Sequence, residues 1–156
     1  MRRALALLAA ALLLAPAAPG PQVVDLAGAA WTRDGLPPDA APPVLPMPGA
    51  PSQVELAFPK LGTRWACEFS TDAPATRRLA LSWQGAPDGL LFEVVLDGQR
   101  LSPPRDAWRP AARALRSDLG SVWLGRGAHL LEFVAREKPP APPGRLRLAA
   151  LELGEP

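Results

Sequence analysis

The feature that most constrains this chain is a period-two alternation of apolar and polar residues, which recurs in short runs after Ser52. The run at 53–58, for example, places Val54, Leu56 and Phe58 on one face. Successive side chains of a strand point to opposite sides, so such runs are typical of β-strands with one buried face. The runs are at 53–58, 64–70, 77–84, 90–96, 99–101, 121–124, 129–136 and 145–153. Their number and spacing predict an all-β fold, an antiparallel β-sandwich.

Proline and one Asp-Gly step separate these runs. The chain has 21 Pro, and they are dense between residues 34 and 51. Proline fixes φ and lacks a backbone donor, so we expect this stretch to cross the surface as an extended loop. Asp97-Gly98 is the strongest short turn signal, and it predicts a tight hairpin between two strands.

Residues 105–119 depart from the alternation. Their apolar positions recur at intervals of four, three and four residues, and their arginines fall on another side. The apolar positions are Trp108, Ala112, Leu115 and Leu119, and the arginines are Arg105, Arg109, Arg113 and Arg116. This spacing is helical, and Pro110 suits a first turn. We therefore predict one short helix or helical loop joining two strands.

The N-terminus has the three parts of a secretory signal peptide. Arg2 and Arg3 give a basic start, an Ala/Leu run follows from residue 4 to 15, and small residues end at Ala17. The run is shorter than the roughly 20 residues that span a bilayer. A signal peptide at 1–17, cleaved after Ala17, is thus favoured over a retained anchor. We expect a mature protein that is secreted or periplasmic.

Removal of the signal leaves 139 residues (156 minus 17), enough for one domain with a substantial core. We assign 18–52 to an N-terminal extended, Pro-rich segment packing on the domain, and 53–156 to the β-sandwich itself. The full chain has 17 basic and 15 acidic residues; losing Arg2 and Arg3 leaves 15 of each. This balance gives no compositional support for a nucleic-acid partner.

Few residues offer catalytic or metal chemistry. Cys67 is the single cysteine and alternates with aromatic residues, which predicts a small buried hydrophobe. His129 is the single histidine and is expected at a turn or strand edge. The sequence contains no Gly-x-Ser-x-Gly nucleophile motif whose serine this histidine could activate. Neither a usual zinc set nor calcium-loop spacing occurs. Glu93 and Glu132 could meet across strands, as carboxylates do in many sandwiches. We expect no cofactor, no metal site and no enzymatic activity.

The order of several segments is similar to that of a known family. The segments are an aromatic-ended strand at 65–69, a turn at 71–74, strands at 79–83 and 92–98, a Gly-x-His hairpin at 124–133 and a closing strand at 146–153. This order resembles the galactose-binding-like jelly rolls of many carbohydrate-binding modules, and the likeness covers roughly residues 53–153. The resemblance implies a jelly-roll sandwich and, as a class, sugar binding by loop aromatics and polar side chains.

Tryptophan is the best side chain for stacking on a sugar ring, and the chain has five. Trp65 and Trp83 alternate with apolar residues and are expected in the core, whereas Trp123 fits either role. Trp31 and Trp108 lie outside the predicted strands, beside charged residues. The predicted ligand site is therefore Trp108, Arg105, Asp106, Arg109 and Trp31. The favoured alternative is that Trp108 anchors the helical loop to the sheet and its arginine neighbours face water.

The arginines around this segment allow a second hypothesis. Five of them, less Asp106 and Asp118, leave a local charge of +3, which suits an anionic polysaccharide or a phosphorylated surface. The five are Arg105, Arg109, Arg113, Arg116 and Arg126. The favoured alternative is a solvated face, because 15 Arg against two Lys is typical of a GC-rich bacterium.

Three functions follow from these observations. The first is a secreted or periplasmic, non-catalytic binding module for carbohydrate. The second is a structural or assembly protein of the cell envelope, whose sandwich binds a partner protein. The third, a hydrolase using scattered carboxylates, is disfavoured. No nucleic-acid partner and no stable membrane span after signal cleavage are expected.

Overall fold

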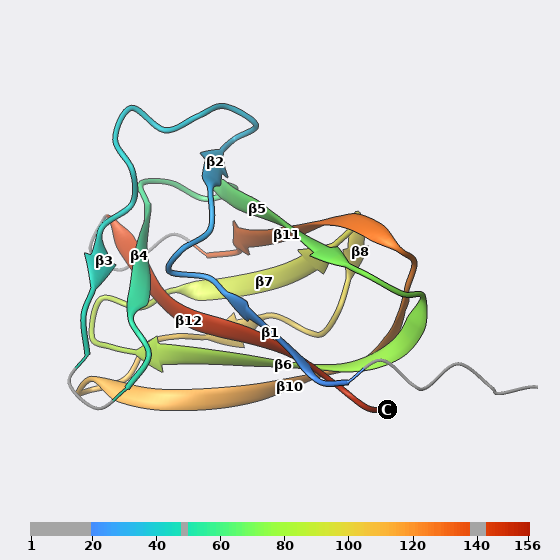
Figure 1. Cartoon of the computed structure of the whole chain (residues 1–156). Helices are drawn as coiled ribbons and strands as arrows, with labels where there is room; N and C mark the ends of the chain where they lie inside the picture. Colours follow the sequence, from blue (N-terminus) through green and yellow to red (C-terminus); the bar gives the residue numbers. More distant parts are fainter. Residues whose placement is uncertain (1–19, 48–49, 138–142) are drawn as a thin grey trace, which may run out of the picture.

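The computed structural model describes residues 20–47, 50–137 and 143–156, so the predicted signal peptide lies outside the described residues. The described chain forms two six-stranded sheets in which every strand pairing is antiparallel (Figure 1). The strands are β1 (Gln22–Asp25), β2 (Trp31–Arg33), β3 (Val44–Leu45), β4 (Gln53–Phe58), β5 (Arg64–Thr71), β6 (Ala75–Gly85), β7 (Leu91–Leu96), β8 (Gln99–Arg100), β9 (Arg105–Asp106), β10 (Arg113–Leu124), β11 (Gly127–Ala135) and β12 (Gly144–Gly154). Within these ranges no helix is long and apolar enough to cross a membrane.

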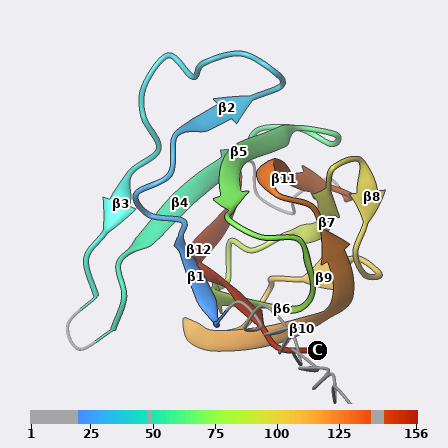
Figure 2. The same ribbon diagram turned by 45° about the vertical axis from the view of Figure 1, so that its right-hand side comes forward.

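The two sheets face each other as a sandwich (Figure 2). Sheet A has the order β10-β6-β12-β4-β3, with β1 beside the end of β12. Sheet B has the order β2-β5-β11-β7-β8, with β9 beside β7. From β4 to β7, and again from β10 to β12, successive strands alternate between the two sheets. This crossing from sheet to sheet is the connectivity of a jelly roll, and it confirms the predicted fold class.

The core forms where the apolar faces of the two sheets meet. In β6 the inward side chains are Leu79, Leu81 and Trp83, and all three are buried. Trp83 meets Phe92 of sheet B edge-to-face, with ring centroids 5.3 Å apart. The strand predictions from alternation are confirmed, because the apolar face of each main strand is the buried one.

The predicted hairpin turn at Asp97-Gly98 is confirmed. It joins β7 to β8, and its two residues have φ of 49° and 80°. Two successive positive φ values are the geometry of a type I′ turn, for which Asp-Gly is well suited. The Asp97 side chain also reaches the neighbouring strand, where Oδ1 accepts a hydrogen bond of 2.8 Å from the backbone N–H of Leu130.

The helix predicted at residues 105–119 is wrong. This segment contains β9 and the first half of β10, and the described residues around it contain no helix. Long-range pairing with β6 outweighs the local helical spacing, since β10 hydrogen-bonds to that strand along its whole length. Leu115, Ser117 and Leu119 point inward at a spacing of two, and a bulge at Leu119 interrupts the register between Asp118 and Gly120.

The residues before β4 add short strands to both sheets. β1 pairs with β12 and β3 with β4 in sheet A, while β2 pairs with β5 in sheet B. β2 and β3 lie at sheet edges and have only three and two residues. Between them and β4 the Pro-rich stretch leaves few backbone donors for longer pairing.

Candidate functional site

The outer face of sheet A carries a group of charged side chains over its central strands. Alternation in β6 sends Arg78, Ala80 and Ser82 outward, opposite the core residues. The register places Asp118 of β10 beside Ala80 on one side and Glu152 of β12 beside it on the other. Arg116 lies opposite Ser82 in the next row. Three strands therefore bring these side chains to one face, although they come from distant parts of the sequence.

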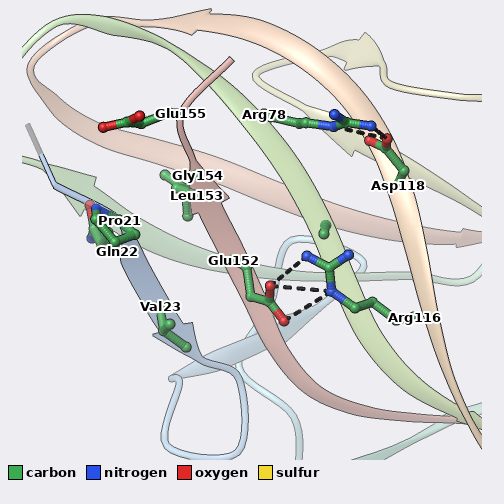
Figure 3. A pocket seen from close by; sticks show the side chains of 11 residues that line it. Pro21, Gln22, Val23, Arg78, Arg116, Asp118, Glu152, Leu153, Gly154 and Glu155 are labelled. Carbon is green, nitrogen blue, oxygen red and sulfur yellow. Dashed lines mark hydrogen bonds and ion pairs between the residues drawn. The ribbon is translucent and has the colours of Figure 1, made fainter. Parts of the chain in front are cut away.

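The charges on this face are arranged as two ion pairs (Figure 3). Arg78 Nε donates to Asp118 Oδ2 at 3.0 Å. Arg116 Nη2 donates to Glu152 Oε2 at 2.7 Å, and Ser82 Oγ donates to Glu152 Oε1 at 3.3 Å. The hydrogen bond from Arg78 lowers the pKa of Asp118, and that from Arg116 lowers the pKa of Glu152. Both carboxylates are therefore ionised at neutral pH.

Between the two pairs lies a depression, here called the polar hollow, with a volume of about 480 Å³. Ala80 and Gly154 are small, which leaves the space open, and Pro21 and Val23 beside β12 form one side (Figure 3). The volume is within the range of about 300–1,000 Å³ usual for small-molecule sites. The hollow presents guanidinium donors and carboxylate acceptors within reach of a bound hydroxyl group.

Trp123 is on the same face, beyond Arg78. β10 pairs Ser121 with Arg78 and Trp123 with Thr76, so Trp123 and Arg78 are diagonal neighbours on the outer side. The Trp123 side chain is 66% exposed, whereas Leu124 next to it is buried. An exposed ring beside hydrogen-bonding charged groups is a platform for a ligand with an apolar face and a polar rim. The local sequence fits either a buried or an exposed Trp123, because the face on which it lies depends on the β10–β6 register.

The residues of the sequence-predicted site are only partly brought together. Asp106 Oδ1 accepts a hydrogen bond of 2.8 Å from the Trp108 backbone N–H, and Arg109 Nη1 donates to the Asp106 carbonyl at 3.1 Å. Arg105 Nη2 instead donates to the backbone carbonyl of Asp118 at 2.7 Å. Trp108 is 48% exposed, and its backbone forms an isolated parallel β-bridge with Ala86.

Trp31 is separate from that group. It is on β2 in sheet B and is buried, with its ring centroid 6.0 Å from that of Phe133. Its indole N–H donates to the Leu26 carbonyl at 3.1 Å. Of the two predicted tryptophans, only Trp108 therefore offers a ring face to solvent.

Three of the five arginines between residues 105 and 126 bond to different partners. Arg116 pairs with Glu152, Arg105 binds a backbone carbonyl and Arg109 binds those of Asp106 and Trp108. For these three arginines the arrangement favours separate, internally bonded side chains over a single cationic surface, while Arg113 and Arg126 are exposed.

His129, expected at a turn or strand edge, lies near the start of β11, between β5 and β7, and is buried in a hydrogen-bonded cluster. Its Nδ1 is 2.7 Å from Asp97 Oδ2, and its Nε2 is 2.9 Å from the Gly125 carbonyl and 3.1 Å from Thr71 Oγ1. Burial lowers the pKa of His129, but hydrogen bonds to Asp97 and Gly125 outweigh it, and the net shift is upward. Thr71 is 3% exposed and donates its hydroxyl to Gly125, so the Thr-His-Asp alignment joins two turns rather than presenting a nucleophile.

The other side chains that could be reactive are buried or paired. Burial raises the pKa of the Cys67 thiol to about 12, so the thiol stays protonated. Glu132 pairs with Arg64 at 2.9 Å, and Glu93, 0% exposed, pairs with Arg100 and Arg136. The described residues contain no group of three or more His, Cys, Asp or Glu placed to hold a metal ion.

No protein-family model matches the sequence, and no curated protein matches it either. Solved structures do share its fold. A Paenibacillus xanthan lyase is similar to 89% of this chain with a TM-score of 0.73 and 14% identity, and this chain spans 14% of the lyase. A family 35 carbohydrate-binding module from Clostridium thermocellum is similar over 88% of this chain and 100% of its own length, with a TM-score of 0.51 and 11% identity.

A further similar structure is the CBM36-1 domain of a multidomain xylanase from the hindgut metagenome of Trinervitermes trinervoides. It has a TM-score of 0.53 and 10% identity, and it covers 88% of this chain and 98% of the domain. At these identities the likeness shows the fold alone. The resemblance stated from the sequence is confirmed at that level: the chain has the jelly-roll fold found in carbohydrate-binding modules.

Proposed function

We propose that this protein is a non-catalytic carbohydrate-binding module that works outside the cytoplasm, secreted or periplasmic. The observation that carries the proposal is the exposed Trp123 beside the polar hollow on sheet A. A sugar ring has apolar C–H faces and a rim of hydroxyls. The indole ring provides a stacking surface for the faces, and the two ion pairs provide donors and acceptors for the hydroxyls.

Two further findings support this function. The similar structures include carbohydrate-binding modules that this chain matches over nearly their whole length. The N-terminal pattern of basic start, Ala/Leu run and small residues supports export to a compartment where polysaccharides are met. The carboxylates and the histidine best placed for catalysis are engaged in internal ion pairs and hydrogen bonds, which favours binding over hydrolysis.

The test is a polysaccharide array followed by affinity measurement on two matched variants. Trp123→Ala should weaken binding by about 1–3 kcal/mol, by analogy with other aromatic stacking platforms. The melting temperature should stay unchanged, because that ring is largely in water. Trp108→Ala removes the other exposed indole and should leave the affinity intact.

The alternatives give different results. If Trp108→Ala abolishes binding and Trp123→Ala does not, the ligand site is the loop cluster of Trp108, Asp106 and Arg109. If the protein binds no polysaccharide on the array, the carbohydrate proposal fails, and the envelope-assembly function would be tested next by cross-linking in the native host.

A further inference from the structure

A second depression, here called the apolar hollow, adjoins the polar hollow along sheet A. Its volume is about 340 Å³, and Arg116 lines both depressions. Its lining also includes Gln53, Ser82 and Ala114. The β10–β6 register places Ala114 opposite Gln84, two residues beyond the Arg116–Ser82 pair. Trp123, the polar hollow and the apolar hollow therefore follow one another along β6 on the outer face of sheet A, and they form one line.

The apolar hollow contains a polar atom that the fold leaves unused. Gln53 is 5% exposed, and its Oε1 is buried without a hydrogen-bond partner among the described residues. A buried acceptor that makes no hydrogen bond is costly, so an unpaired one calls for an explanation. Because Gln53 lines the hollow, rotation of its side chain would bring Oε1 to the surface of the hollow, where a ligand hydroxyl would supply the missing donor.

The line of three features is too long for one sugar. Along β6, Thr76 beside Trp123 and Ser82 beside Arg116 are six residues apart, which corresponds to about 20 Å. The apolar hollow extends the line further. A ligand that contacts all three features is a chain of several sugar units passing across the sheet.

The charges along this line favour an uncharged chain. The polar hollow is lined by Arg78 and Arg116 on the cationic side and by Asp118, Glu152 and Glu155 on the anionic side. Both arginines are already paired with carboxylates. A carboxylated or sulfated polymer would find no unpaired cation in this lining and would be repelled by the surplus of anions.

We infer that sheet A binds an internal stretch of a linear, neutral polysaccharide, with Trp123, the polar hollow and the apolar hollow as successive subsites. This inference rests on the proposed carbohydrate-binding function. Trp123 stacks on one sugar. Arg116 contacts the sugar bound where the two hollows meet, and Gln53 accepts a hydrogen bond from a sugar hydroxyl in the apolar hollow.

The experiment is calorimetric titration of the full mature chain with mannan-, xylan- and cellulose-derived oligosaccharides, from disaccharide to hexasaccharide. Affinity for the bound series should rise with length up to the point where all subsites are filled. Ala114→Leu, which narrows the apolar hollow, and Gln53→Leu should each weaken hexasaccharide binding about tenfold. Both should leave disaccharide binding unchanged. Ala112→Leu, an exposed change outside the lining, is the matched control.

Charge preference is measured with two polymers of the same backbone, hydroxyethyl cellulose and carboxymethyl cellulose, in affinity gels. Retention by the neutral polymer alone supports the inference if the cellulose series is bound. Tighter binding of the carboxymethyl polymer, affinity independent of chain length, or an unaffected Ala114→Leu variant overturns it while leaving carbohydrate binding in place. Failure to bind any glycan overturns the proposed function, and the inference with it.

Discussion

Glu93 allows a stability prediction that depends on which partner of an ion cluster is removed. Its side chain is 0% exposed on β7, whereas those of Arg100 and Arg136, which pair with it, are 59% and 41% exposed. After Glu93→Gln, both guanidinium groups can turn into water. After removal of both arginines, the carboxylate remains buried without a cation, which is the more costly state.

The magnitudes should differ accordingly. Isolating a buried charge costs about 3–5 kcal/mol, so Arg100→Ala combined with Arg136→Ala should lower the free energy of unfolding by about that amount. Glu93→Gln loses the charge-assisted hydrogen bonds to Arg100 and Arg136, but water can hydrogen-bond to these exposed guanidinium groups instead. The substitution should therefore lower the free energy of unfolding by about 1–2 kcal/mol. Adding Glu93→Met to the double arginine variant should recover most of the loss, because no buried charge is left.

The assay is guanidinium chloride unfolding at neutral pH, followed by tryptophan fluorescence, since Trp83 lies in the core. Equal slopes of the transitions would show that the variants unfold from comparable states. The reasoning is refuted if Glu93→Gln costs as much as the double arginine variant, or if Glu93→Met fails to rescue it.

Three other predictions follow from the described contacts. Phe92→Ala should lower the free energy of unfolding by about 3–5 kcal/mol, because Phe92 is fully buried between the sheets; chemical denaturation measures this, and a loss below about 1 kcal/mol would contradict it. The raised pKa of His129 stabilises the fold below the unfolded pKa, and this contribution is lost as pH rises through the folded pKa. The melting temperature of the native chain should thus fall more between about pH 6 and about pH 8 than that of His129→Gln, and equal slopes would exclude the effect. N-terminal sequencing of the protein from its native host should find a mature end between Ala18 and Gln22, whereas an intact Met1 in a soluble cytosolic fraction would refute export.

Local patterns in the sequence were sufficient for most strands. β4 has the bounds that alternation at 53–58 predicts, because its side chains face a core on one side along its full length. The Asp97-Gly98 turn was also predictable from local sequence, since two residues determine its backbone geometry. The segment at 105–119 was mistaken for a helix because residues four apart, such as Leu115 and Leu119, lie on one face of a strand as well as on one face of a helix.

The candidate site could not be predicted in this way. Arg78, Asp118 and Glu152 are far apart in the sequence, and only the pairing of β6 with both β10 and β12 brings them to one face. Trp123 faces outward because the register resumes after the bulge at Leu119. Long-range strand register decides both points, and a pattern within one segment carries no information about it.

The same bulge determines how β10 behaves as an edge strand. β10 is twelve residues long and, among the described strands, pairs only with β6, so its other side is open to another chain. At the bulge the Asp118 carboxylate accepts a hydrogen bond of 2.9 Å from the Gly120 N–H, and Arg105 donates a hydrogen bond to the Asp118 carbonyl. Backbone groups that a second copy would need for cross-strand pairing are already satisfied, and charged side chains flank them. The bulge thus acts against edge-to-edge aggregation at the point where this sandwich is most open to it.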